Sequence, residues 1–130
     1  MTGSELDDLF SEIFEYKKIP IDNFHWNAEI IRSFDRAVSF MEKGNCLVHC
    51  IAGMHRSPTY VIAYLIKKYK MSYEHAYKLV KSKRYCIEPP EKFIIQLKKY
   101  EEKLNQQQNN DANLTNNNNR QNVLNEQIQI

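Results

Sequence analysis

The sequence predicts an α/β fold, and three consecutive features predict it. Residues 46–49 (CLVH) form a compact apolar run of the kind that fills a buried strand. Residues 50–56 follow no helical or strand period and contain a glycine, so we expect a loop there. Ser57 and Pro58 then open a helix that runs to about Lys70, because proline is tolerated in a first helical turn. A strand, a loop and a helix in succession, followed by further helices, are typical of an α/β arrangement.

Two elements are expected before this unit. Residues 16–21 (YKKIPI) indicate a short strand that ends at the turn-prone pair Asp22-Asn23. Residues 28–41 indicate a helix that ends at Gly44. Its apolar residues recur at helical spacing: Ile31, Phe34, Ala37, Val38 and Met41.

Two further helices are expected after it. Ser72 can cap the first of them, whereas Pro89 and Pro90 stop the chain and start the second. The inner stripes of the two helices contain Ala76, Leu79 and Val80, and Phe93, Ile94 and Leu97.

At 130 residues the chain fits one domain with appendages. We expect residues 1–15 to form an acidic N-terminal segment that can become helical, since it carries acidic side chains and no Lys or Arg. Residues 16–104 then form the folded domain. Residues 105–130 are dominated by Asn and Gln and lack the apolar area that offsets chain entropy, so we expect a disordered tail.

Composition excludes some classes of function and leaves one question open. The net charge is +2, and cations gather between Lys67 and Lys103. This stretch presents either solvated helix faces or a basic surface that attracts phosphorylated or acidic partners. No nucleic-acid-binding motif accompanies it, so we expect no nucleic-acid partner. The start of the chain does not resemble a signal peptide, and the longest apolar run, 60–66, is too short to cross a membrane.

The three cysteines indicate reduced thiols, and hence the cytoplasm with the nucleus as the alternative. If Cys46 and Cys50 share one strand, roughly 13 Å separates them, which is beyond the reach of a disulfide. We interpret Cys46 and Cys86 as packing residues of the core or its edge.

The loop 50–56 places a thiol where a helix begins. A free cysteine is mostly protonated at neutral pH, and a positive end nearby shifts it toward the thiolate. The N-terminus of the helix supplies such an end, and its amides bind anions. Five residues separate Cys50 from Arg56, enough for the loop to curl around one phosphoryl group with its N–H groups pointing inward. Arg56 can close the ring with a two-pronged contact, and Gly53 permits unusual backbone geometry at the tip.

The segment 49–57, HCIAGMHRS, resembles the signature loop of the protein tyrosine and dual-specificity phosphatases. The resemblance covers about residues 16–102. It rests also on the 16–21 segment, Phe34-x-x-Ala37-x-x-Phe40, the 61–65 segment, and Ile87-x-Pro89 followed by Phe93 and Gln96-Leu97. It implies a three-layer phosphatase-type domain, with a short central sheet flanked by helices, truncated at its N-terminus.

Relatives usually carry several dozen more residues before the 16–21 strand. The sheet is therefore expected to lack edge strands, which leaves apolar surface exposed unless the 6–14 segment covers it. A naturally minimal domain, a misassigned start and a fragment are all compatible with this length.

The resemblance also implies roles for individual residues. Cys50 attacks phosphorus and forms a phosphocysteine, while Arg56 holds the equatorial oxygens as charge spreads over them. Ser57 hydrogen-bonds the thiolate and eases its release, and His49 orients the loop. The phosphate is expected to be surrounded by Ile51, Ala52, Gly53, Met54, His55 and Arg56. No cofactor and no metal is implied, and the four histidines show no metal-ligand spacing.

The general acid of the family is an aspartate on an upstream loop, and Asp22 is our candidate for it. In many relatives the acid falls one place later, where this chain has Asn23, which has no carboxyl proton to donate. The alternative is that Asp22 simply ends a strand in a turn.

Two functions follow from these residues. The first is a monomeric phosphatase that hydrolyses phosphotyrosine and phosphoserine/threonine in proteins. The second is a phosphatase-like domain, catalytically weak or inactive, that binds phosphorylated proteins. The Asn23 at the usual place of the acid and the missing N-terminal part motivate the second, whereas the intact Cys50, Arg56 and Ser57 favour the first.

Overall fold

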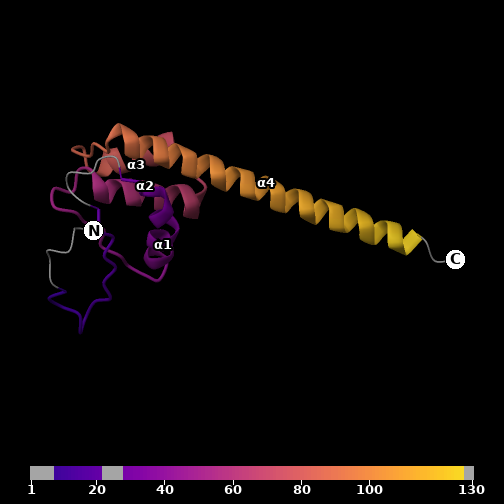
Figure 1. The fold of residues 1–130 in the computed structure, drawn as a ribbon, viewed down its shortest axis with the longest axis horizontal. Coiled ribbons are helices and arrows are strands. Elements are labelled where there is room, and N and C mark those ends of the chain that lie inside the picture. The colour runs from indigo at the N-terminus through magenta and orange to yellow at the C-terminus, as the bar shows by residue number, and fades with distance from the viewer. Residues whose placement is uncertain (1–7, 22–27, 128–130) are drawn as a thin grey trace.

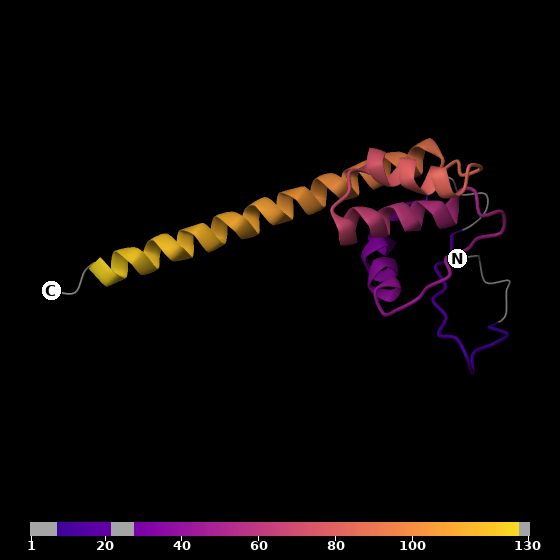
Figure 2. The ribbon, with the colours of Figure 1, turned by 180° about the vertical axis from the view of Figure 1, so that it is seen from behind.

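The computed structural model describes residues 8–21 and 28–127, with side chains through residue 112. Four helices make up its regular structure: α1 (Ile31–Met41), α2 (Arg56–Tyr69), α3 (Tyr73–Lys83) and α4 (Glu91–Gln127). Helix α2 contacts each of the other three, and α4 extends far beyond them (Figure 1). The view from behind shows α1 below α2, with α3 and the start of α4 above it (Figure 2).

The structure confirms the four predicted helices, with small shifts at their starts and a much longer α4 than expected. Helix α3 begins after Ser72, whose Oγ accepts a hydrogen bond from the backbone N–H of His75 at 3.3 Å. Helix α4 begins directly after Pro90, whose carbonyl accepts from the N–H of Phe93 at 2.8 Å. Helix α2 ends at Tyr69, and Lys70 after it adopts the left-handed conformation that commonly terminates helices.

Helix α1 starts three residues later than expected, and its cap comes from another helix. Its N-cap residue, Ile30, makes no capping bond through its own side chain. Instead, Gln96 Oε1 in α4 accepts from the N–H groups of Ile30 and Ile31 at 2.7 and 3.0 Å. Gln96 Nε2 donates to the carbonyl oxygen of Ala28 at 3.0 Å. These bonds satisfy two of the orphan N–H groups of α1 and fix the start of α1 on α4.

The core lies where α1 and α4 meet α2. Phe34 is fully buried, and its ring packs edge-on against Tyr60 and Tyr100, at centroid distances of 5.4 and 5.2 Å. The buried tyrosine hydroxyls have partners: Tyr60 shares a 2.6 Å hydrogen bond with Ser33, and Tyr100 donates to Asp35 at 2.7 Å. The three aromatic rings therefore join three helices without leaving a polar group unpaired.

The two expected strands are not formed, so the central sheet is missing from the described residues. Residues 14–21 and 45–50 have no regular structure. A strand exists only by pairing with a neighbour, and local alternation cannot supply that neighbour. Ile19 and Ile21 are buried nonetheless, whereas Leu47 is 86% exposed. Cys46 is also exposed, so its interpretation as a packing residue was wrong.

Apolar side chains line an open cavity of about 660 Å³ between residues 8–18 and 43–49. Residues 9–13 form turns, and no helix forms over residues 8–15. Phe10 and Phe14 line the cavity but stay more than half exposed. The N-terminal segment thus covers this face only in part.

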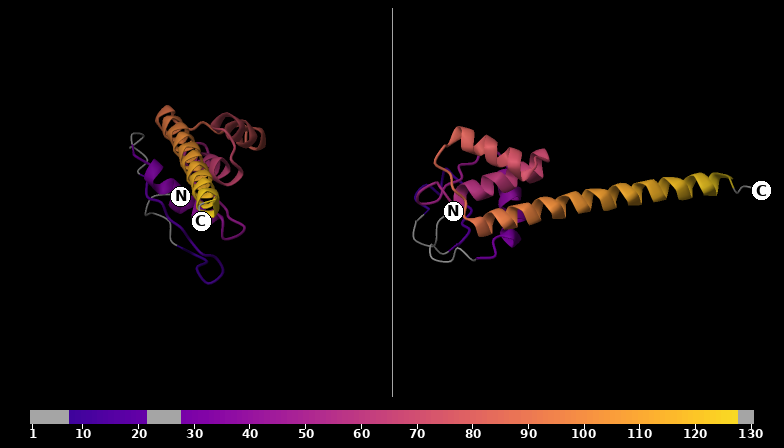
Figure 3. Two further views of the ribbon diagram at one scale, coloured as in Figure 1. Left: turned by 90° about the vertical axis from the view of Figure 1, so that its right-hand side faces the viewer. Right: turned by 90° about the horizontal axis from the view of Figure 1, so that it is seen from above.

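Helix α4 continues to Gln127, into the stretch for which the sequence predicts disorder. This differs from the expectation for a physical reason. Once the core holds the first turns of α4, each further residue adds one backbone hydrogen bond without a new nucleation cost. The last side chain packed against the core is Leu104, and side chains 105–112 are exposed. Figure 3 shows this part of α4 leaving the helical body.

Within the described ranges, no helix combines the length and the apolar character needed to span a bilayer. The division into a domain over 16–104 and a separate tail stays a prediction, which truncation can test.

Ending the chain after Leu104 is expected to change the free energy of unfolding by at most about 0.5 kcal/mol, because the described side chains beyond it are exposed. Ending it after Lys99 also removes Tyr100 and Leu104, and is expected to cost about 3 kcal/mol or more. Urea denaturation of the two truncations and the full chain measures both effects. Equal losses in the two truncations would contradict the boundary.

Candidate active site

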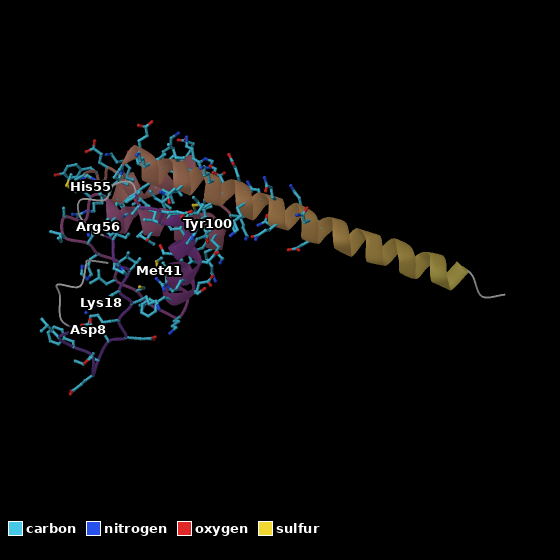
Figure 4. The ribbon with its side chains drawn as sticks, viewed as in Figure 1. Asp8, Lys18, Met41, His55, Arg56 and Tyr100 are labelled. Carbon is cyan, nitrogen blue, oxygen red and sulfur yellow. The ribbon has the colours of Figure 1, made fainter. Side chains whose placement is uncertain are left out.

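The structure brings Cys50, Arg56 and Ser57 together at the N-terminal end of α2. All three are buried, with exposures of 8%, 6% and 5%. The sulfur of Cys50 lies 3.3 Å from Ser57 Oγ, within hydrogen-bond distance. His55 and Arg56 lie side by side where the loop enters the helix (Figure 4). The thiol of Cys50 thus lies at the buried start of α2, beside the Ser57 hydroxyl and the backbone amide of Arg56.

The surroundings of Cys50 favour its thiolate. Burial opposes ionisation of the thiol. The Ser57 hydroxyl and the backbone amides of Ser57, Gly53 and Arg56 outweigh that cost and lower the pKa of Cys50 from 9.0 to about 7. The start of α2 has no side-chain cap, so its amides are available to a negative sulfur. A large fraction of Cys50 is therefore ionised at neutral pH.

Arg56 links the loop to the segment that precedes it by 35 positions. Its Nη1 donates to the carbonyl oxygen of Ile21 at 3.0 Å in a buried contact. This contact brings the residue just before Asp22 to the guanidinium. Asp22 itself, with Asn23, lies outside the described residues, and its role as the acid stays a prediction.

The other loop residues differ in exposure. Ile51 and Ala52 are exposed, whereas Gly53, Met54 and His55 are half-buried, and His49 is exposed. Gly53 has a φ of 65°, which confirms that the tip of the loop uses the backbone freedom of glycine. The ring of His55 binds the carbonyl of Glu88 through Nδ1, so it braces the loop as well as bordering it.

Sequence reasoning missed a second segment, residues 84–88, that holds the loop from outside. Arg84 Nε donates to the carbonyl of Gly53 at 3.0 Å, and Nη2 donates to that of Ala52 at 3.3 Å. The N–H of Glu88 donates to the carbonyl of Met54 at 2.8 Å. No local pattern marks these residues, because each contact spans more than thirty positions.

The arrangement suits an anion with several oxygens. Within the described residues, no three His, Cys, Asp or Glu side chains gather as metal ligands would. The amides of the loop and of the first turn of α2, together with the guanidinium of Arg56, supply donors of the kind that bind phosphate. The sulfur of Cys50 lies among the backbone amides of Gly53, Arg56 and Ser57.

Comparison with known proteins agrees with this geometry. The family model for the dual specificity phosphatase catalytic domain matches residues 4–103. Human dual specificity protein phosphatase 6 is 42% identical over 106 residues, which are 76% of this chain and 28% of that protein. A probable rhodanese domain-containing dual specificity protein phosphatase from Dictyostelium discoideum is 36% identical over 107 residues, 78% of this chain and 22% of that protein. The chain thus spans about a quarter of the length of these curated relatives.

Solved structures give the same result for the fold. The crystal structure of a human tyrosine phosphatase-like serine/threonine/tyrosine-interacting protein matches with a TM-score of 0.66 and 35% identity, over 71% of this chain and 64% of that one. The structure of DUSP15 matches with a TM-score of 0.70 and 26% identity, over 82% of this chain and 73% of that one. The overall class is therefore the α/β phosphatase fold, although the described residues form no sheet.

Replacing Ser57 by alanine is expected to raise the pKa of Cys50 by about one to two units, since a hydrogen bond to a charged group contributes about 1.5–3 kcal/mol. The rate of alkylation by iodoacetamide as a function of pH measures this pKa, in a chain that carries Cys46→Ser and Cys86→Ser so that only Cys50 reacts. The midpoint is expected near pH 7 before the Ser57 change. Equal midpoints with and without the Ser57 hydroxyl would show that the amides alone hold the thiolate.

Proposed function

The chain belongs to the dual-specificity phosphatase family, and on that premise we propose that it hydrolyses phosphotyrosine and phosphoserine/threonine in proteins through a phosphocysteine intermediate. The observation that carries this proposal is the buried Cys50, with a pKa of about 7, beside Arg56 and a ring of backbone amides. Thiolate and phosphate-binding donors meet at one point there, which is what displacement at phosphorus needs.

In the first step the thiolate of Cys50 attacks phosphorus. A sulfur–phosphorus bond forms, and the bond from phosphorus to the ester oxygen breaks. Arg56 and the loop amides hold the three non-bridging oxygens while charge spreads over them. The departing oxygen takes a proton, and we assign Asp22 as its donor. This assignment is supported by the hydrogen bond from Arg56 to the carbonyl of Ile21, the residue directly before Asp22.

In the second step a water molecule attacks the phosphocysteine. Asp22, now a carboxylate, accepts the proton of the water, and the sulfur leaves as a thiolate. The hydroxyl of Ser57, 3.3 Å from the sulfur, can donate to it as the negative charge returns. His49 precedes the nucleophile, and we assign to it the orientation of the loop by its match to the family motif.

The proposed substrates are phosphorylated proteins with either kind of ester. Ile51 and Ala52 on the outer part of the loop are exposed, which supports a shallow and open approach to the sulfur. We propose that the chain acts as a monomer. The free cysteines support the cytoplasm or nucleus as its compartment.

A phosphatase-like binding domain is the second candidate. One solved structure favours it, that of the tyrosine phosphatase-like interacting protein. It matches 71% of this chain. Phosphopeptide binding alone does not separate the two candidates, because the loop binds an anion in both.

Turnover separates them. Phosphotyrosine peptide hydrolysis is expected to disappear in Cys50→Ser and to survive in Cys46→Ser, since Cys46 is exposed and lies outside the loop. No turnover by the folded parent chain would refute the enzyme and leave the binding domain.

Asp22→Asn is expected to lower the rate by about 10²- to 10⁴-fold, as the loss of a general acid does. Glu29→Gln is the matched control, because Glu29 is an exposed carboxylate seven positions along the chain whose ion pair, at 3.2 Å, is with Arg32. The rate is measured with phosphotyrosine peptide across pH. An unchanged rate in Asp22→Asn would remove Asp22 from the mechanism while leaving the role of Cys50 intact.

A further inference from the structure

We propose that Arg84, which lies outside the signature loop, is a positioning residue that turns the amides of the loop toward the sulfur of Cys50 and the bound phosphate. The proposal deepens the proposed function and rests on it for the identity of the anion. Its physical basis lies entirely in residues that the structure describes.

The argument begins with the direction of the carbonyl groups. Arg84 holds the carbonyl oxygens of Ala52 and Gly53, and the N–H of Glu88 holds that of Met54. Three consecutive peptide units of the loop therefore direct their oxygens toward the 84–88 segment. Because a trans peptide is planar, the N–H of each unit points away from its own C=O. The N–H groups that follow these three carbonyls are thereby directed to the opposite side of the loop.

That opposite side contains the nucleophile. The amide of Gly53, which shares a peptide plane with the carbonyl of Ala52, is one of the groups that hold the pKa of Cys50 down. The peptide unit between Ala52 and Gly53 thus binds the Arg84 guanidinium through its carbonyl and the sulfur of Cys50 through its N–H. A cation bound to a carbonyl oxygen also polarises the peptide, which strengthens its N–H as a donor.

The geometry requires arginine rather than any cation. Nε and Nη2 of one guanidinium reach two successive carbonyl oxygens, whereas the ammonium of a lysine is a single point on a flexible stem. The fit also depends on Gly53. A Cβ at that position would lie 2.9 Å from Arg84 Nη2, so the guanidinium packs on the bare backbone of the loop.

The backbone of Arg84 is itself held in place. Its N–H donates to the carbonyl of Val80 at 2.9 Å, which closes the end of α3. Three residues later, Ile87 is 1% exposed and its carbonyl accepts from Lys81 Nζ at 2.8 Å. The 84–88 segment is therefore anchored in the core at one end and on α3 at the other, and it can act as a fixed support for the loop.

The test uses Arg84→Met and Arg84→Lys, with Lys83→Met as the matched control because Lys83 is an exposed cation one position away. Two quantities are measured in the full chain carrying Cys46→Ser and Cys86→Ser. They are the pH midpoint of Cys50 alkylation by iodoacetamide and the protection of Cys50 from alkylation by inorganic phosphate. Neither needs turnover, so failure of this proposal and failure of the phosphatase proposal are distinguishable.

Arg84→Met is expected to raise the alkylation midpoint by about half a unit to one unit and to weaken phosphate protection about three- to tenfold, the range of one net hydrogen bond. Arg84→Lys, which keeps the charge but loses the fork, is expected to show most of this effect. Lys83→Met is expected to show little. If Arg84→Met does not fold, Arg84→Lys carries the test by itself.

Two outcomes would overturn the proposal. The first is an unchanged midpoint and unchanged protection in a folded Arg84 variant. The second is an equal shift in Lys83→Met, which would mean that diffuse surface charge, not the contact with the loop, stabilises the thiolate.

Discussion

The buried N-terminus of α2 is the constraint on which the rest of the structure depends. Its first residues, from Arg56 through Tyr60, are all buried, and no side chain caps the amides of its first turn. Buried N–H groups need acceptors, and His55, at the N-cap, supplies none through its side chain. The sulfur of Cys50 takes this place, as would the oxygens of a bound phosphate. The N–H groups at the start of α2 therefore favour the thiolate form of Cys50.

The same helix is also the centre of the packing, which ties the site to the stability of the domain. Helix α2 meets α1, α3 and α4, and Tyr60 near its start is packed against Phe34 of α1. The support of the loop comes from the far ends of these neighbours: Arg84 follows α3, and Glu88 precedes α4. The elements that build the core are therefore the elements that set the position of the loop.

The sequence predicted the features that depend on local pattern and failed on those that depend on distant partners. Helical spacing, Ser72 and Pro90 located the starts of the helices to within a few residues, because the information for a helix start lies near it, but the end of α4 was not predicted. The strand expected over 46–49 failed because pairing needs a second segment. Arg84 and Gln96 were not identified as supports, because a side chain that binds a backbone group 31 to 68 residues away leaves no periodic trace.

Gly44 before the loop and Gly53 within it are expected to differ in how well they tolerate substitution. Around Gly44 no described atom stands within 4 Å of where a Cβ would be, so many residues fit there. Gly53 stands under the guanidinium of Arg84, at a φ that other residues rarely adopt. Replacing either member of this pair alone creates a clash or an unfilled contact. Position 53 is accordingly expected to stay glycine among descendants of this chain even where position 84 changes, whereas position 44 is expected to vary.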